Sequence, residues 1–177
     1  MNSEVEVRVL GDGELRNSIS ALCRLLIDCV RDGASLGFLL DLNQEDADKY
    51  WNTVAQRSES GALVVLGAFV GDDLAGTVTL VFSSMPNQQH KAEVSKLLVS
   101  PSFRRHGIAT VLMQTVEALA SEFDREILVL DTLTGTPAEI FYEKTGWQKV
   151  GEIPHFAQLP EGGEPLPTSL FYKDLRK

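Results

Sequence analysis

Several features that define large classes of proteins are scarce in this sequence. Cysteine occurs only at Cys23 and Cys29, and their six-residue spacing within one predicted helix fits neither a metal-ligand pattern nor a disulfide, so both thiols are expected to be reduced and packed. No apolar run approaches the roughly 20 residues that cross a bilayer. Residues 1–7 alternate like a strand and lack the basic and apolar parts of an export signal. A soluble, cytoplasmic protein without a membrane partner is expected.

Basic residues are also in short supply. The chain has 16 Lys and Arg against 25 Asp and Glu, which gives a formal net charge of -9. This charge repels phosphate backbones and anionic lipids, so it argues against a nucleic-acid partner and favours a cationic or neutral substrate. The length of 177 residues predicts a single domain, 1–177, with a sizeable core. Oligomeric state depends on surface patches, and the sequence leaves room for a homodimer.

Hydrophobic periodicity organises the first half of the chain. Val5, Val7 and Val9 alternate with charged residues as in a half-buried strand, whereas the apolar residues from Leu15 to Cys29 recur at helical steps. The predicted elements are a strand at 4–10, a helix ending before Gly33, a helix capped by Asn43 and running to about Arg57, and an antiparallel strand pair at 62–70 and 74–82.

The pattern in the second half of the sequence predicts a crossover connection between parallel strands. Pro101 ends the fourth predicted strand, at 92–99, and a helical stripe from Ile108 to Phe123 separates it from the next strand. The predicted elements are strands at 92–99 and 127–130 with that helix between them, a helix from Pro137 toward Gly146, and strands at 147–153 and 169–173. Residues 159–167 are rich in proline and glycine and are predicted to form an irregular loop.

Residues 100–109, Ser-Pro-Ser-Phe-Arg-Arg-His-Gly-Ile-Ala, carry the clearest chemical signal. They lie between a buried strand and an amphipathic helix, whose N-terminus offers unpaired N–H groups and partial positive charge. Small residues at Gly107 and Ala109 let a phosphate approach closely, and Arg104 and Arg105 add charge-assisted hydrogen bonds. The segment therefore predicts an anion site, although a plain helix cap with two solvated arginines is the alternative.

This segment resembles the pyrophosphate-binding signature of the GNAT superfamily of N-acetyltransferases, in which Gln or Arg precedes Gly by three positions and Gly or Ala follows two further on. A second match, Phe141-Tyr142-Glu143-Lys144-Thr145-Gly146-Trp147, follows in the correct order. The resemblance implies acetyl-CoA as cosubstrate and no metal. It also implies an α/β (α+β) three-layer sandwich whose mixed, mainly antiparallel sheet contains a splayed parallel strand pair. The implied cofactor-binding residues are Leu98, Val99, Arg104, Arg105, His106, Gly107, Ile108, Ala109 and Thr110.

Several further segments are similar to the tabtoxin-resistance acetyltransferases of that superfamily. These segments are Gly33 to Phe38, Met85 to Asn87, Leu130 to Thr132 and the Pro-rich stretch near the end. The similarity implies transfer of an acetyl group to the amine of a small molecule, either an amino-acid-like compound or a toxin or antibiotic. One departure stands out: many members of the superfamily place an asparagine seven residues before the tyrosine, where this chain has Gly135.

The resemblance also assigns two catalytic roles. Tyr142 matches the tyrosine that commonly protonates the departing CoA thiolate, although it also suits a packing role beside Phe141 or Trp147. Glu93 is the candidate base, directly or through water, because an alkylammonium with a pKa near 10.4 must lose a proton before it attacks a thioester. The alternative is that Glu93 is a polar residue on the solvent-exposed face of a strand, without a catalytic role.

Two loops are expected to select the amine, the one between the first two helices and the one before the final strand. They offer Phe38, Asp41, His155 and Phe156, and an ammonium could pair with Asp41. Two other functions fit the same motifs: a peptide or protein N-acetyltransferase, which needs an open groove, and a non-catalytic acyl-CoA-binding module, which has no use for Tyr142.

Overall fold

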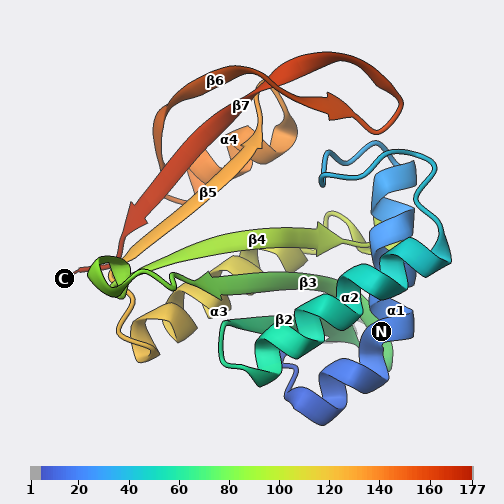
Figure 1. Cartoon of the computed structure of the whole chain (residues 1–177), viewed down its shortest axis with the longest axis horizontal. Coiled ribbons are helices and arrows are strands. Elements are labelled where there is room, and N and C mark those ends of the chain that lie inside the picture. The colour runs from blue at the N-terminus through green and yellow to red at the C-terminus, as the bar shows by residue number, and fades with distance from the viewer. Residues whose placement is uncertain (1–4, 177) are drawn as a thin grey trace.

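A computed structural model describes residues 5–176. Within this range seven strands form one sheet in the order β1-β2-β3-β4-β5-β7-β6. All neighbouring pairs are antiparallel except β4 and β5, which are parallel (Figure 1). The elements are β1 (Val5–Val9), α1 (Asp12–Arg31), α2 (Gln44–Glu59), β2 (Leu63–Val70), β3 (Asp73–Phe82), β4 (Lys91–Val99), α3 (Ile108–Glu122), β5 (Ile127–Leu133), α4 (Pro137–Lys144), β6 (Gln148–Leu159) and β7 (Gly162–Asp174), with short 3-10 turns at Pro86–Gln88 and Pro101–Phe103.

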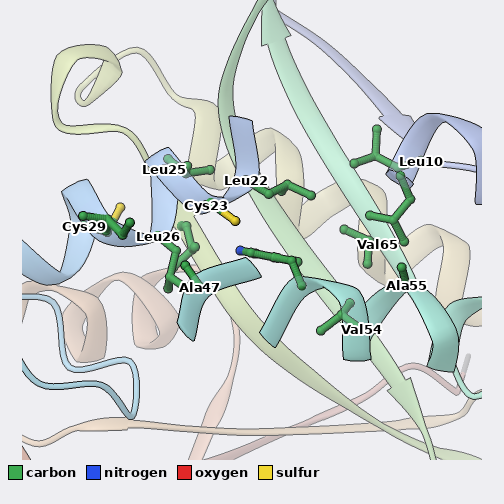
Figure 2. Packing of buried hydrophobic residues seen from close by; sticks show 14 of the residues in the cluster. Leu10, Leu22, Cys23, Leu25, Leu26, Cys29, Ala47, Val54, Ala55 and Val65 are labelled. Carbon is green, nitrogen blue, oxygen red and sulfur yellow. The ribbon is translucent and has the colours of Figure 1, made fainter. Parts of the chain in front are cut away.

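Two hydrophobic clusters pack on opposite faces of the sheet. Side chains of α1 and α2 form one with inward residues of β2, including Leu22, Leu26, Val54 and Val65, as Figure 2 shows. The other joins α3, α4 and the far face of the strands through residues such as Leu112, Leu128 and Tyr142. Cys23 and Cys29 are free and buried in the first cluster, as expected from their spacing. The predicted three-layer α+β sandwich is thereby confirmed.

Most of the predicted elements occur close to their expected bounds. Asn43 caps α2, since its side-chain oxygen accepts a hydrogen bond from the backbone N–H of Asp46 at 3.0 Å. The first strand is confirmed over Val5–Val9, and residue 4 of the predicted strand lies outside the described range. Phe123, predicted to continue the buried stripe of α3, is instead 42% exposed because the helix ends at Glu122. Its ring packs against Phe82, with centroids 5.1 Å apart.

The prediction of an irregular loop at residues 159–167 is wrong. β6 continues to Leu159 and β7 begins at Gly162, so the two strands form a long hairpin that arches beside the α1–α2 loop (Figure 1). Pairing of β5 with β7 reaches only to Thr168, and residues 162–167 pair with no strand other than β6, although the N–H of Thr134 still donates to the Pro167 carbonyl at 3.0 Å. Prolines are tolerated there because a backbone that lacks an N–H can face the side without a partner strand. Register shifts in the β6–β7 ladder accommodate the irregular sequence.

Candidate active site

The parallel strands β4 and β5 separate partway along their length. Their pairing runs from Lys91 and Ile127 to Glu93 and Val129 and stops there, although β4 continues to Val99 and β5 to Leu133. The two ribbons diverge from that point in Figure 1. Beyond Glu93, the backbone groups of β4 that face β5 have no strand partner within residues 5–176. This open edge can accept hydrogen bonds from, and donate them to, an extended amide-containing ligand.

A bulge interrupts β4 at the start of this open edge. Thr77 and Thr79 of β3 pair with Leu98 and Ser95, which leaves one extra residue on β4, and Lys96 in that stretch has a positive φ of 53°. The extra residue shifts the alternation by one position, so the side chain of Leu98 is buried against the α1–α2 layer, whereas Ala92 and Val94 face the α3 layer. The carbonyl of Val99 contacts the Cys29 thiol, with Sγ 3.5 Å from the oxygen. Both predicted pantetheine-binding residues therefore lie on the unpaired part of β4.

The turn after β4 presents the predicted anion site to solvent. The side chains of Arg104, Arg105 and His106 are exposed, and Gly107 has a φ of 75° as the N-cap of α3. No side chain of the described residues caps this helix, so its first N–H groups remain available. Arg104 is paired with Asp32 at the end of α1. Ile108 is buried beneath the turn, while Ala109 and Thr110 are half-buried in the first helical turn.

Gly76 of β3 determines how closely α3 approaches the sheet. A Cβ at this position would lie 2.8 Å from the carbonyl oxygen of Leu98 and about 3 Å from side-chain carbons of Ile108 and Leu112. Only glycine lets the N-terminal turn of α3 settle against β3 and β4 in this way. No local pattern in the sequence indicates this contact, because it depends on which segments the fold brings together.

Tyr142 lies on the buried side of α4. Its ring packs at an angle against Trp147 and Phe171, with centroids 6.0 Å and 5.9 Å away, and the residue is 7% exposed. Burial, with a smaller contribution from the Asp131 carboxylate, raises the pKa of its phenol. No hydrogen bond to the hydroxyl is found within residues 5–176, so the proton remains available to a ligand.

A polar network fixes the start of α4 and therefore the position of Tyr142. The Glu139 carboxylate accepts hydrogen bonds from the Gly135 N–H at 2.6 Å, the Lys149 ammonium at 2.6 Å and the Ser169 hydroxyl at 2.7 Å. Lys149, then Ser169 and Gly135, lower the pKa of Glu139 to about 2. Gly135, which replaces the common asparagine of the superfamily, has a φ of 78° and forms the turn into this helix.

Two carboxylates and one ammonium lie where the strands separate. Ala92, Val94, Leu128 and Leu130 face the α3 layer, so the residues that alternate with them, Glu93 and Asp131, face the α1–α2 side. Glu93 is exposed, and Asp131 accepts a hydrogen bond from the Thr168 hydroxyl at 2.9 Å. Both carboxylates act on the nearby Lys96 ammonium. The sequence analysis did not identify Asp131 and Lys96 as site residues, although charged residues within otherwise apolar strands were a signal.

The two segments expected to select the amine contact each other, but the second is not a loop, since His155 and Phe156 lie in strand β6. The N–H of Leu40 in the α1–α2 loop donates a hydrogen bond to the carbonyl of Pro160 in the β6–β7 turn at 2.8 Å. Phe38 of the first loop packs edge-on against Tyr50 of α2, with centroids 5.3 Å apart. Asp41, His155 and Phe156 are exposed, and His155 has a φ of 50°. Among the described residues, no group of His, Cys, Asp and Glu is arranged to hold a metal ion.

Comparison with known proteins shows the class to which this fold and site belong. Residues 22–147 match the model of the Acetyltransferase (GNAT) family. An N-acetyltransferase of Staphylococcus aureus Mu50 has 18% identity, with 98% of this chain and 100% of that one covered at a TM-score of 0.79. A ribosomal-protein-alanine N-acetyltransferase of Brucella melitensis has 20% identity, coverages of 96% and 99%, and a TM-score of 0.76.

A third similar structure was solved with a ligand. It is yncA of Salmonella typhimurium with its cofactor acetyl-CoA, at 15% identity, coverages of 99% and 96%, and a TM-score of 0.75. The fold and these comparisons define an acetyltransferase that uses acetyl-CoA. The chain belongs to the GNAT family, because the family model matches more than half of its length. None of the helices in the described residues is both long and apolar enough to cross a membrane.

The residues of this chain fit acetyl-CoA at two places. The open edge of β4 offers backbone groups to the amides of the pantetheine arm, and the uncapped N-terminus of α3 offers N–H groups to the pyrophosphate. Gly107 adds to the fit, since no atom lies within 4 Å of the place where its Cβ would be. The thioester of acetyl-CoA supplies the activated acetyl group.

Proposed function

We propose that this protein is an N-acetyltransferase that moves the acetyl group of acetyl-CoA to the amine of a small molecule. The hydrogen bond from Leu40 to Pro160 is the observation that carries the proposal, because it joins the two loops beside the separated strands. With the α1–α2 loop and the β6–β7 turn held together, less space remains beside the separated strands for a polypeptide chain than for a small amine. The similarity to the tabtoxin-resistance acetyltransferases supports an amino-acid-like compound, a toxin or an antibiotic as acceptor.

In this proposal the amine attacks the thioester directly within a ternary complex. The nitrogen forms an amide bond to the acetyl carbon, the C–S bond breaks, and the sulfur leaves as a thiolate. Glu93, directly or through water, takes the proton from the amine, and the Tyr142 hydroxyl gives a proton to the thiolate. The Tyr142 hydroxyl has no hydrogen-bond partner among residues 5–176, and a phenol is protonated at neutral pH, so it is free to donate to the departing sulfur.

The cofactor-binding residues are proposed along one continuous segment. Leu98 and Val99 pair through their backbone with the pantetheine arm, and Arg104, Arg105, His106, Gly107, Ile108, Ala109 and Thr110 surround the pyrophosphate. To bind a phosphate, the Arg104 guanidinium has to leave the Asp32 carboxylate or contact both anions at once. Arg105, which is exposed and forms no ion pair with a described residue, is the more accessible cation.

A peptide or protein acceptor is the second candidate. The similar Brucella melitensis structure is named for a ribosomal-protein alanine, so the fold alone does not choose between the two classes of acceptor. The contact between the α1–α2 loop and the β6–β7 turn favours the small molecule. A non-catalytic acyl-CoA-binding module is the third candidate, and the unbonded Tyr142 hydroxyl argues for catalysis instead.

Release of CoA thiol in the presence of acetyl-CoA and a panel of acceptors tests the proposal. The panel holds amino acids, simple amines, amine-containing antibiotics and peptides with free N-termini. We expect turnover with free small amines and little with peptides. Turnover with peptides only would support the second candidate, and binding of CoA by calorimetry without any turnover would support the third.

Glu93→Gln and Asp131→Asn, measured across pH, identify the base. Loss of the base is expected to lower kcat by about 10²-fold or more near neutral pH. Activity should recover as pH rises toward the amine's own pKa near 10.4, because the acceptor then loses its proton unaided. If Asp131→Asn shows this behaviour and Glu93→Gln does not, the assignment moves from Glu93 to Asp131.

We also propose one domain over residues 1–177, a cytoplasmic location and a homodimer. Val150, Ile153 and Phe156 are exposed on the edge strand β6, where a second copy could pair. Sedimentation equilibrium tests the homodimer, and fractionation of cells that produce the protein tests its location.

A further inference from the structure

Lys96 occupies an unusual position for a lysine. It lies in the bulge of β4, with a φ of 53°, and its side chain is half-buried. Its Nζ is 5.9 Å from the ring centroid of Phe38 and 5.8 Å from that of Tyr50. Two aromatic rings, one from the α1–α2 loop and one from α2, therefore flank an ammonium beside the point where β4 and β5 separate.

This ammonium lacks a close anionic partner. Glu93 and Asp131 act on it electrostatically, but neither of them, nor any other carboxylate within residues 5–176, forms an ion pair with it. Burial is the largest influence and lowers the pKa of Lys96, while the two carboxylates act in the opposite sense. A desolvated cation without a hydrogen-bonded anion is costly, so the site gains free energy when an anion binds there.

Charges around the site restrict which anion can bind. The pyrophosphate of acetyl-CoA is proposed to bind beyond Val99, at the N-terminus of α3, and the anion beside Lys96 must come from another molecule. Two nearby carboxylates and the acidic chain disfavour a doubly charged phosphate. A carboxylate whose own molecule also carries an ammonium suits the site better, because Lys96 attracts one charge while Glu93 and Asp131 attract the other.

We propose that Lys96 is a specificity-determining residue that binds a carboxylate of the acceptor, so that the preferred acceptors are amino acids and their derivatives rather than simple amines. Phe38 and Tyr50 hold the Lys96 side chain in place and keep water away from this ion pair. The inference rests on the proposed function, since it concerns the acceptor of that same reaction.

Matched acceptors that differ in one carboxylate test the inference. Rates of CoA release are measured with L-lysine against cadaverine, L-ornithine against putrescine, and L-phenylalanine against phenethylamine. We expect kcat/KM to be at least tenfold higher for the amino acids. In Lys96→Met, the KM for the amino acids is expected to rise about 10- to 100-fold, as for a lost charge-assisted hydrogen bond, with the amines unaffected. Lys96→Arg should restore part of the preference.

Lys91→Met, on the same strand but away from the separated ends, is the matched control and should leave the preference unchanged. Thermal melting and the KM for acetyl-CoA show whether a variant is folded and binds its cosubstrate. Equal use of amines and amino acids by the wild-type protein, or equal losses for both in Lys96→Met, overturns the inference while the proposed function stands. Absence of turnover with every acceptor, despite acetyl-CoA binding, contradicts the proposed function itself.

Discussion

The Tyr142 side chain combines a rigid ring with a hydroxyl that has no partner among the described residues. Trp147 and Phe171 hold the ring from two directions, so its position does not depend on a hydrogen bond. The hydroxyl oxygen is not one of the fully buried polar atoms that lack a hydrogen-bond partner, so it reaches solvent and is open to a ligand. Donation to a leaving thiolate is the role proposed here.

Tyr142→Phe separates this role from packing. The phenyl ring keeps the contacts with Trp147 and Phe171, so the melting temperature and the affinity for acetyl-CoA should change little. We expect kcat to fall by about 10²-fold, since the variant has lost a general acid. Tyr172→Phe, which removes a surface hydroxyl bonded to Gln148, serves as the control and should keep full activity. A normal kcat for Tyr142→Phe would contradict the catalytic role and would show that Tyr142 serves only in packing.

At the scale of elements, the fit of α3 against β3 sets the position of the proposed anion site. A side chain at position 76 meets the Leu98 carbonyl and the first turn of the helix. Gly76→Ala should therefore destabilise the protein by about 1–3 kcal/mol and shift α3 away from the sheet. We expect the KM for acetyl-CoA to rise several-fold. Gly151→Ala, where a Cβ meets nothing within 4 Å, is the matched control. Equal acetyl-CoA kinetics in both variants would contradict this role.

The Glu139 network at the start of α4 predicts a dependence of stability on pH. Its folded pKa of about 2 lies below the ordinary value of 4.5, so the network stabilises the fold above about pH 4.5 and loses this effect as pH falls toward 2. We expect Glu139→Gln to cost about 1–3 kcal/mol at pH 7 and less at pH 3. Urea unfolding at both pH values measures this. Glu143→Gln, on the exposed side of α4, is the control, and a Glu139→Gln deficit that is equal at both pH values contradicts the account.

Elements with strong local patterns were predictable from the sequence, and contacts between distant segments were not. The Asn43 cap, the hairpin around Gly71 and the turn from Arg104 to Ala109 all depend on residues close together in the chain. The bulge at Lys96 and the extension of β7 through Pro165 and Pro167 depend on neighbouring strands. For the same reason the sequence predicted an anion site and a role for Tyr142 from local motifs, but it did not reveal that Asp131 and Lys96 lie near each other.

At the scale of the whole molecule, the N-terminal and C-terminal parts meet above the separated strands through the Leu40–Pro160 hydrogen bond. Leu40→Pro removes the donor, whereas Leu40→Ala keeps it and removes only an exposed side chain. We expect Leu40→Pro to raise the KM for small acceptors about 5- to 10-fold, in line with a lost hydrogen bond of about 1 kcal/mol, and to admit short peptides. Leu40→Ala should behave like the wild type. If the two variants behave alike, the contact between the α1–α2 loop and the β6–β7 turn does not select the acceptor.

The parallel pair that ends at Glu93 and Val129 also makes the sheet incomplete. In the proposed complex, a thioester along β4 would take the place of a missing strand and bind only the native state, so the free energy of unfolding is expected to rise with the concentration of the donor. At a hundredfold excess over the dissociation constant this linkage amounts to about 2.7 kcal/mol. Cells depleted of acetyl-CoA and CoA would then degrade the enzyme faster, and its abundance would follow the supply of the molecule it consumes.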